Sequence, residues 1–385
     1  MVNWDSNVCP QGIYIHWPFC KNKCHYCDFV SFAKHEGYQQ IYHEALLKEI
    51  KIFAKHLNRN LKKQIKTIFL GGGSPSLYPL DLLEELIDVL KDNFDFSLLK
   101  EFTIEANPAD VTEKHLKCWR KIGINRLSIG VQVLDDKVLE KLNRYQKSQD
   151  VINLMKIAPK YFDNISIDLI LGLPCVTNDI WKKTLQALAL WPINHISIYF
   201  LTVYEKTKLY FRIKQGEVVL SNEEEQILLY EQTIRFLKKN GFNQYEISNF
   251  AKPGFESIHN IGYWDFLPYK GFGLSASSFD GFSRFMNYKN LSKYLNNVVV
   301  GKCFDFEVLT EEQQVMEVLM LGLRQTKGMD LHRMLYLLKD SSKCKFLEKI
   351  NSLKSQGLIK VFGSRIQLTL KGMFVENEVI LNLLS

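Results

Sequence analysis

The sequence lacks the features that place a chain in or across a membrane. It contains no run of about 18 apolar residues, so it predicts no membrane-spanning helix. Its first residues, MVNWDSNVCPQGIYIHW, do not show the basic segment followed by an apolar segment that is typical of a secretory signal. We therefore expect a cytoplasmic protein, in a compartment where cysteines stay reduced.

A large excess of one charge is also missing. The 49 basic and 42 acidic residues give a formal net charge of +7 over 385 residues, and the lysines are spread along predicted helices. This mild excess is more typical of a solvated surface than of a nucleic-acid site, so we expect no nucleic-acid partner. It would still favour an acidic ligand, such as a nucleotide or a tetrapyrrole with propionate groups.

Cysteine is sparse, with eight residues, but three of them lie close together near the start of the chain. Cys20, Cys24 and Cys27 follow the spacing C-x3-C-x2-C. Thiolates hold iron–sulfur clusters, and a cubane cluster usually takes four, so three would leave one iron open to a small molecule. The spacing favours such a cluster over a zinc site completed by His25, and the scattered remaining cysteines do not suggest a disulfide framework.

The first two thirds of the chain alternate between predicted strands and predicted helices. Apolar, β-branched runs predict six strands, at Ile13–Trp17, Thr67–Leu70, Phe102–Glu105, Arg126–Ile129, Ile165–Leu171 and His195–Phe200. Helical periodicity lies between them, at residues 38–57, 79–92, 112–121, 135–142, 148–159 and 178–190. Such alternation predicts a parallel sheet. Six units fall short of a closed barrel, and polar strand ends favour an incomplete (β/α)6 barrel of the TIM type over a doubly wound open sheet.

The remainder of the chain predicts a change of architecture. After a helix at 222–240, residues 245–288 are aromatic and glycine-rich with little periodicity, and irregular segments of this length tend to be functional. Helical patterns at 310–325, 329–338 and 343–356 then precede short strands at 358–362 and 365–369. This order describes a smaller, α+β winged-helix-like domain, which we expect to pack or bind a partner because its third helix offers no base-reading surface. The predicted domains are residues 1–240, a connecting segment over 241–304, and residues 305–385.

A glycine-rich turn and several strand ends carry further candidate chemistry. The stretch Gly71-Gly72-Gly73-Ser74 follows the second predicted strand, and its amides would cradle an amino-acid-like ligand, although a tight turn without a ligand is an equal alternative. Glu105, Gln132, Arg144 and Asp168 lie at or after other strand ends. Each alone is typical of a core or cap residue. Aimed together at one mouth, they would suit a nucleoside.

Together these motifs resemble a known family. The string Tyr14-Ile15-His16-Trp17-Pro18-Phe19-Cys20, with Cys24, Tyr26, Cys27, Asp28 and Phe29, is similar to the cysteine motif of the radical S-adenosylmethionine (SAM) superfamily. Gly-Gly-Gly-Ser-Pro-Ser, the stretch from Asp168 to Pro174, and Tyr245-Glu-Ile-Ser-Asn-Phe more narrowly resemble the oxygen-independent coproporphyrinogen III oxidase-like family. The resemblance runs from residue 12 to residue 290 and weakens over the tail. It implies a partial barrel of the radical SAM type.

The resemblance also implies cofactors and the residues that hold them. Cys20, Cys24 and Cys27 would ligate a [4Fe-4S] cluster whose open iron binds SAM, and an electron from the cluster would cleave the sulfonium. The positions that match SAM contacts of the family are Tyr14, Tyr26, Gly72, Gly73, Ser74, Glu105, Gln132, Arg144 and Asp168. Some of the polar positions serve a second SAM in the oxidase, so the resemblance leaves their individual roles open.

Two functions of different classes fit this family. One is an oxidase that uses the radical to decarboxylate coproporphyrinogen III, and the other is a chaperone that binds heme and transfers it to an acceptor protein. The chaperone group is favoured because the cysteine loop begins early, Phe29 stands where the oxidases typically have another cysteine, and His259-Asn260-Ile261-Gly262-Tyr263-Trp264 matches the HNxxYW signature of that group. Imidazole is a common axial ligand of heme, so His259 is the candidate ligand. Without the family context, a histidine satisfied by its neighbours is the more common case.

The chaperone interpretation implies heme beside the cluster and SAM, a protein that accepts heme, and a protein that donates electrons. Heme-carrying relatives indicate that a homodimer can form. Gln146 and Phe200 depart from the histidine and glutamine of the family pattern, which affects the expected SAM contacts but not the cluster. A radical SAM methyltransferase is less favoured, because the oxidase-like motifs extend well beyond the cysteine loop.

Overall fold

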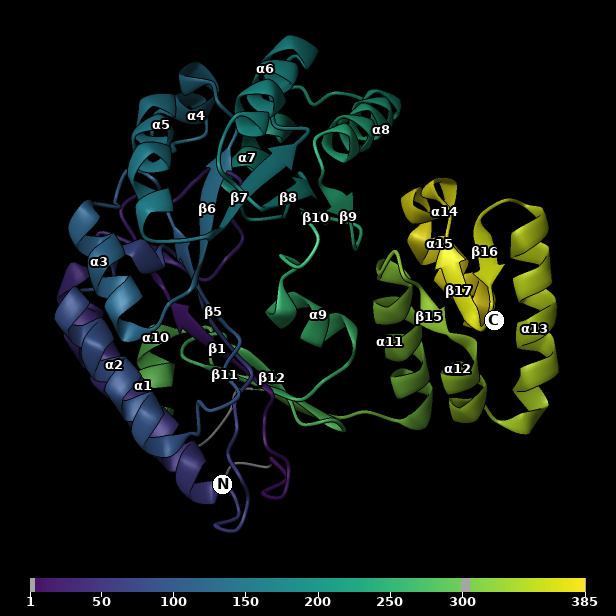
Figure 1. The fold of residues 1–385 in the computed structure, drawn as a ribbon, viewed down its shortest axis with the longest axis horizontal. Helices are drawn as coiled ribbons and strands as arrows, with labels where there is room; N and C mark the ends of the chain where they lie inside the picture. Colours follow the sequence, from purple (N-terminus) through teal and green to yellow (C-terminus); the bar gives the residue numbers. More distant parts are fainter. Residues whose placement is uncertain (1–3, 299–304, 385) are drawn as a thin grey trace.

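The structure, a computed structural model, describes residues 4–298 and 305–384. Its largest element is a curved mixed sheet of twelve strands (Figure 1). Six neighbouring strands of this sheet are parallel, as the sequence predicts: β1 (Gly12–Trp17), β4 (Thr67–Gly72), β5 (Glu101–Ala106), β6 (Arg126–Gln132), β7 (Asn164–Leu171) and β8 (His195–Phe200). Their carboxyl ends therefore meet at one mouth.

Helices cover the outer face of the parallel strands (Figure 1). They are α1 (Gln39–His56), α2 (Leu80–Asn93), α3 (Glu113–Ile122), α4 (Asp136–Lys141), α5 (Ser148–Ile157) and α6 (Asn178–Ala189). Alternate strand residues such as Ile68, Leu70 and Ile104 are fully buried in the core. The residues between them, including Glu105 and Asp168, face the inside of the partial barrel. One face of the sheet thus builds the core and the other is polar.

Local capping interactions fix where these helices begin and end. In α3, the Thr112 side chain and His115 form a reciprocal capping box, and Gly123 ends the helix with a φ of +104°. In α6, the Thr177 hydroxyl accepts a hydrogen bond from the Ile180 amide at 3.3 Å. Defined helix ends keep the connections to the next strands short, which holds the mouth in place.

Residues 245–288 are more regular than their sequence predicts. β10 (Asn249–Ala251) pairs antiparallel with β8, and after α9 (Ile258–Trp264) the strand β11 (Tyr269–Phe272) pairs parallel with β1. β12 (Ser277–Phe279), β13 (Ser283–Met286) and β14 (Asp305–Val308) extend this edge antiparallel, and β9 (Asn243–Gln244) forms the other edge. The expectation of little regular structure here is wrong, because strands this short show too few alternations to be recognised.

A second, smaller unit follows at the end of the chain (Figure 1). Its elements are α11 (Glu311–Arg324), β15 (Met329–Asp330), α12 (Leu331–Leu337), α13 (Asp340–Ser355), β16 (Ile359–Phe362), β17 (Arg365–Leu368), α14 (Leu370–Phe374) and α15 (Glu376–Leu384). Leu319, Phe346 and Ile366 lie in a hydrophobic core of its own. Helices followed by the β16–β17 hairpin are the order expected for a winged-helix-like module.

The helices α7 (Lys208–Lys214), α8 (Glu223–Lys239) and α10 (Leu291–Asn297) complete the barrel region. The predicted connecting segment contributes β11, β12 and β13 to the same sheet as β1, and its end, residues 299–304, lies outside the described residues. Within the ranges 4–298 and 305–384, no helix combines the length and apolar character needed to cross a membrane.

Candidate functional site at the barrel mouth

The three clustered cysteines lie in one loop after β1. Cys20 ends β2 (Phe19–Cys20), which pairs with β3 (Phe32–Ala33), so the loop is closed at its base. The Cys27 amide donates a hydrogen bond to the Cys24 carbonyl at 3.1 Å, which tightens the second half of the loop. All three thiols are free and partly buried. The fold therefore brings the predicted cluster ligands to a single place.

Burial controls the acid–base properties of these thiols. Burial raises the pKa of Cys20 to about 11, although hydrogen bonds from Ser74 and Ser31 lower it, and Cys27 and Cys24 add to the increase. Three neighbouring thiolates would therefore need a cationic centre among them, which iron supplies. Among the described residues, no three His, Cys, Asp or Glu side chains are grouped as for a single metal ion. A cubane cluster instead bonds each thiolate to a different iron.

The glycine-rich turn packs directly against the first cysteine. The Gly73 amide donates to the Trp17 carbonyl at 2.7 Å, and the Ser74 amide donates to the Phe19 carbonyl at 3.0 Å. The Ser74 hydroxyl lies 3.8 Å from the Cys20 sulfur. A Cβ atom at Gly73 would lie 2.9 Å from that sulfur, so only glycine fits between the turn and the loop.

Arg144 connects the cysteine loop to the end of β6. It lies between α4 and α5, and its guanidinium is 3.7 Å from the Cys24 sulfur and donates to the Gly130 carbonyl at 2.6 Å. Its Nε donates to Gln146 at 2.7 Å, so Gln146 orients the arginine. A Cβ at Gly130 would also lie 3.0 Å from the side-chain nitrogen Nε2 of Gln132. Gln132 itself has a φ of +67°, at an irregularity in the β6–β7 pairing.

Two carboxylates face the inside of the barrel near this mouth. Glu105 accepts a hydrogen bond from the Gly72 amide at 3.0 Å, and burial, followed by the charge of Asp168, raises its pKa to about 8. Asp168 accepts from the Ser128 hydroxyl at 2.8 Å, and burial raises its pKa as well. The Ser128 hydroxyl offsets part of the cost of burying Asp168, which still lies close to a second acid, Glu105.

Tyr14 and His16 form the β1 side of the mouth. The Nε2 atom of His16 lies 2.9 Å from the Val30 carbonyl, which can only accept, so Nε2 carries the proton. Burial lowers the pKa of His16 to about 4, and its unprotonated Nδ1 accepts from the Tyr14 hydroxyl at 3.0 Å. The proton of Tyr14 is therefore directed at His16, and the oxygen lone pairs of Tyr14 face elsewhere.

Tyr26 carries an unsatisfied polar group beside this site. Its hydroxyl is buried and, among residues 4–298 and 305–384, has no hydrogen-bond partner. Buried hydroxyls are normally paired, so this atom is a candidate contact for a bound molecule.

Helix α9 closes the opposite end of the barrel. Glu101, at the start of β5, accepts hydrogen bonds from the Ile258 amide at 2.7 Å, the Ser257 hydroxyl at 3.0 Å and the His259 amide at 3.2 Å. A buried carboxylate at the first turn of a helix satisfies its free amides and its dipole. The HNxxYW segment is thereby anchored to the barrel.

Both ring nitrogens of His259 take part in hydrogen bonds within this anchored segment. Its Nδ1 lies 2.8 Å from the Thr67 hydroxyl, its Nε2 lies 2.8 Å from the Tyr263 hydroxyl, and its ring stacks on Phe69. Burial lowers its pKa to about 3, so the ring is neutral. Both ring nitrogens would have to leave a hydrogen bond before either met a heme iron.

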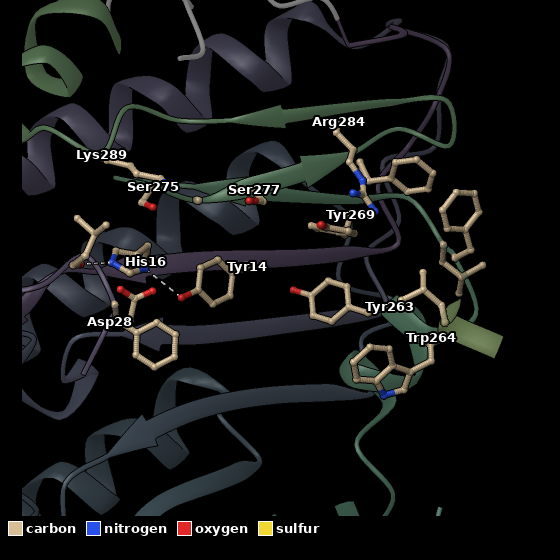
Figure 2. Close-up of a pocket in the computed structure, with 17 residues that line it drawn as sticks. Tyr14, His16, Asp28, Tyr263, Trp264, Tyr269, Ser275, Ser277, Arg284 and Lys289 are labelled. Atoms are coloured by element: carbon tan, nitrogen blue, oxygen red, sulfur yellow. Dashed lines mark hydrogen bonds between the residues drawn. The ribbon is translucent and has the colours of Figure 1, made fainter. Parts of the chain in front are cut away.

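A cavity of about 470 Å³ opens between the cysteine loop, β11 to β13 and α9 (Figure 2). Its walls are rich in aromatic rings, from Tyr14, Phe29, Tyr263, Trp264, Phe266, Tyr269 and Phe279. Asp28, Arg284 and Lys289 supply charge, and Figure 2 shows the two cations at opposite ends. The mouth thus adjoins a space that would hold a large, flat, acidic ligand.

Comparison with known proteins agrees with these features. The Radical SAM superfamily matches residues 14–188, and the HemN C-terminal domain matches residues 309–375. The chain is 33% identical over 371 residues to the heme chaperone HemW of Lactococcus lactis, which covers 96% of both chains, and 36% identical over 377 residues to that of Bacillus subtilis, which covers 96% of this chain and 98% of the relative. The chain belongs to the HemW family of radical SAM proteins.

A solved structure extends the comparison to the fold of this HemW family member. The coproporphyrinogen III oxidase HemN of Escherichia coli, described as a radical SAM enzyme, superposes with a TM-score of 0.85 at 23% identity and covers 99% of this chain and 91% of that one. This confirms the predicted fold class, a partial (β/α)6 barrel of the radical SAM type with a smaller C-terminal α+β domain. The superfamily implies a [4Fe-4S] cluster and SAM as cofactors.

The sequence predicts most of the residues at the mouth, but three kinds of contact become visible only in the structure. Arg126 is buried inside the barrel, where its Nη1 lies 3.5 Å from Thr103, and its place in a strand pattern gave no sign of this. The fixed tautomer of His16 depends on Val30, fourteen residues away. Arg284 lines the cavity from a strand that the sequence did not predict. The electron donor and the homodimer stay predictions of the HemW family resemblance.

Proposed function

We propose that this HemW family member is a heme chaperone, which binds heme beside a [4Fe-4S] cluster and transfers it to an acceptor protein. Both relatives described above carry the name heme chaperone. The observation that carries the proposal is the aromatic cavity that begins directly after Cys27, with Asp28, Phe29 and Val30 in its wall. It would place a flat macrocycle next to the cysteine loop.

The chemistry of the cavity suits a porphyrin. Tyr14 and Tyr263 both line this space, with the Tyr263 hydroxyl pointing toward Tyr14 in Figure 2, and Trp264 adds a third aromatic surface. Heme carries two propionate groups, for which Arg284 or Lys289 would supply a cation. The aromatic walls of the cavity therefore suit the macrocycle of heme, and its cations suit the propionates.

Titration with hemin tests this step. We expect a shifted Soret band that saturates at a defined stoichiometry, and weaker binding in Trp264→Ala. Exposed Tyr336 on α12 offers a matched control, because Tyr336→Ala removes an aromatic ring outside the cavity and should leave binding unchanged. An unshifted hemin spectrum in the wild type would contradict the proposal.

The cluster and SAM belong to the mouth of the barrel in this proposal. Cys20, Cys24 and Cys27 would hold the cluster, and the residues that would hold SAM are Tyr14, Tyr26, Gly72, Gly73, Ser74, Glu105, Gln132, Arg144 and Asp168. The close fit of Gly73 against Cys20, the approach of Arg144 to Cys24 and the Tyr26 hydroxyl, which no described residue pairs with, support this arrangement. A bound cluster would supply an open iron and a source of electrons.

Anaerobic reconstitution followed by iron and sulfide analysis tests the cluster. We expect about four irons per chain in the wild type, and loss of most iron in Cys24→Ser. Cys118→Ser is the matched control, because this partly buried thiol lies on α3, where it contacts Glu84, and should not affect iron content. Fewer than about three irons in the wild type would argue against a cubane cluster.

We propose that His259 supports the heme site mainly through Tyr263, and only secondarily as an axial ligand. Its two engaged nitrogens support the first role, and the coordinating power of imidazole supports the second. Tyr263→Phe removes the hydrogen bond and keeps the imidazole. If His259→Ala and Tyr263→Phe weaken heme binding equally without changing the ligand-field spectrum, the supporting role holds. A changed spectrum in His259→Ala alone would make His259 the ligand.

An oxidase is the second candidate function. The fold shared with HemN favours it, and a porphyrinogen with its propionates would also suit the cations of the cavity. Anaerobic incubation with coproporphyrinogen III, SAM and a reductant separates the two functions. We expect no decarboxylated product, and robust product formation would reverse the choice.

A further inference from the structure

Arg284 stands in the cavity wall but is already paired with a residue of the C-terminal unit. It lies on β13 and forms an ion pair and hydrogen bond with Glu317 of α11. The Arg284 side chain is 44% exposed, whereas that of Glu317 is only 5% exposed. The arginine can therefore be reached from the cavity, while its partner is held inside the protein.

The same helix forms part of the cavity wall. Leu321, one turn after Glu317 on α11, lines the cavity together with Tyr269 and Phe279. Phe266, between α9 and β11, lines the cavity and also packs against the C-terminal hydrophobic core. A ligand that enters near Arg284 would touch both units of the protein.

We propose that Arg284 is the residue that recognises a ligand carboxylate in this cavity, and that Glu317 occupies its place until the ligand arrives. The inference rests on the proposed function, in which the carboxylate is a propionate of heme. The guanidinium would exchange one carboxylate for another and keep its charge paired. Arginine suits this role because its planar group binds carboxylates through two parallel hydrogen bonds.

Both ends of the cavity carry an acid beside the cation, and the Arg284 end is favoured because its paired acid, Glu317, is buried and can be neutralised by a proton. Figure 2 shows Lys289 on the side of the cavity where Asp28 lies, and Asp28 would repel a propionate there. At the Arg284 end the acidic neighbours are Glu317 and Glu307, which is opposite Arg284 in the β13–β14 register. Burial raises the pKa of Glu317, with Arg284 opposing this effect, so a displaced Glu317 would tend to take up a proton and remain buried uncharged.

The exchange would couple heme entry to the docking of the C-terminal unit. Once Glu317 is released, α11 loses this ion pair to β13, while the Gln313 side chain still donates to Glu307 of β14 at 2.6 Å and the Gln325 side chain to Asp265 at 2.9 Å. Bound heme would thus loosen α11 around Glu317. In a chaperone, that would change the surface offered to an acceptor protein.

The test compares hemin with its dimethyl ester, which has the same macrocycle without free carboxylates. Arg284→Gln should weaken hemin about tenfold and leave the ester unchanged, and Glu317→Gln should tighten hemin about threefold or more, again without effect on the ester. Glu312→Gln is the control, because this exposed residue of α11 pairs with Lys339 and should change neither affinity. Thermal melts establish that each variant is folded.

The outcomes separate this inference from the proposed function. If the wild type binds neither compound, the proposed function fails. If it binds both equally and Arg284→Gln changes nothing, the heme site stands and Arg284 is not the carboxylate contact. If Glu317→Gln only lowers stability and leaves hemin affinity as it was, the pair is a fixed structural tie and the exchange is overturned. Faster amide exchange in α11 with hemin, but not with the ester, would support the loosening.

Discussion

Gly73 is the residue at which the turn after β4 and the cysteine loop come closest. In Gly73→Ala, the new Cβ would lie 2.8 Å from the Pro18 carbonyl carbon and 2.9 Å from the Cys20 sulfur. Because backbone lies on one side, the loop must shift and Cys20 with it. We expect reconstituted iron to fall well below the wild-type content, with a stability loss of about 1–3 kcal/mol. Iron analysis and thermal melts measure the two effects.

Gly37→Ala provides the control for this substitution. No atom of the described residues lies within 4 Å of a Cβ at Gly37, and its φ is not in the left-handed region. Full iron content in Gly73→Ala would show that the cysteine loop tolerates the shift and that the close fit is not needed for the cluster.

Glu105 gives a pH-dependent prediction at the same scale. Burial and then Asp168 raise its pKa from 4.5 to about 8, so the folded state holds this proton more tightly than the unfolded state. Ionising Glu105 therefore lowers the stability of the folded state as the pH rises from the pKa of the unfolded chain, 4.5, to the folded pKa of about 8. Glu105→Gln keeps an acceptor for the Gly72 amide and removes the ionisation. We expect the variant without cofactors to exceed the wild type by roughly 1–4 kcal/mol at about pH 8, and by little at about pH 5.

Denaturant titration at both pH values checks this prediction. Ser128→Ala, which removes a hydrogen bond from Asp168, serves as a comparison at the neighbouring acid and should be destabilising at both. An equal difference between Glu105→Gln and wild type at acidic and alkaline pH would show that Glu105 ionises in the folded protein as it does in water.

At the scale of elements, the anchoring of α9 by Glu101 decides the shape of the cavity. Glu101→Gln would replace a carboxylate that accepts from Ser257, Ile258 and His259 with an amide that has one acceptor oxygen. We expect a stability loss of about 2–3 kcal/mol, because buried donors lose their partner. Hemin affinity should fall as well, since α9 carries Tyr263 and Trp264 into the cavity.

A surface glutamate at the start of another helix is the control for Glu101. Glu113 begins α3 and pairs with Lys117, with both side chains more than half exposed. Glu113→Gln should cost less than about 0.5 kcal/mol. Chemical denaturation and hemin titration on both variants would show the contrast, and equal behaviour would mean that α9 is held by packing alone.

The elements that the sequence predicted well share one property. Strands such as β7 and helices such as α1 are long, and each carries a complete hydrophobic pattern that local sequence determines. The strands β11, β12 and β13 have three or four residues, and the first of them, β11, depends on pairing with β1, a strand more than 250 residues earlier. No local pattern contains that information.

The candidate site likewise combines features that local sequence reveals with contacts between residues far apart in the chain. The cysteine loop and the glycine-rich turn are short motifs that local sequence reveals, and the position of the strand-end residues at the mouth followed from the parallel topology. The engagement of His259 with Thr67 and the pairing of Arg284 with Glu317 join residues far apart in the chain. These contacts decide whether a group is available to a ligand, and they required the structure.

At the scale of the whole molecule, Arg324 joins the two units. It ends α11, its guanidinium lies 4.9 Å from the Trp264 ring centroid, and it pairs with Glu246 at 3.9 Å and with Glu376 at 3.4 Å. Its carbonyl accepts from the Ile247 amide at 3.1 Å. Glu246 is fully buried, and Arg324 opposes the rise in its pKa that burial causes. Arg324 therefore compensates the charge of Glu246 and packs against the ring of Trp264, which lines the cavity.

Arg324→Met would leave Glu246 buried without its cation. We expect a loss of about 3–5 kcal/mol, which is typical when one partner of a buried ion pair is removed. The pKa of Glu246 should rise further, so the loss should grow as the pH rises and the carboxylate is forced to ionise. Arg324→Met with Glu246→Gln should recover part of the loss, because the fully buried Glu246 charge is then removed, although Glu376 still lacks its cation.

Urea denaturation at about pH 5 and about pH 8 measures these differences, since the ionisation of Glu246 separates the two conditions. Arg235→Met is the control, because Arg235 makes an exposed pair with Glu231 on one helix and should cost less than about 0.5 kcal/mol. If the double variant is no more stable than Arg324→Met, the junction between the barrel and the C-terminal unit depends on the contact of Arg324 with Trp264 and not on charge. In that case hemin affinity should fall in both variants to the same extent, because the cavity would lose the support of that ring in each.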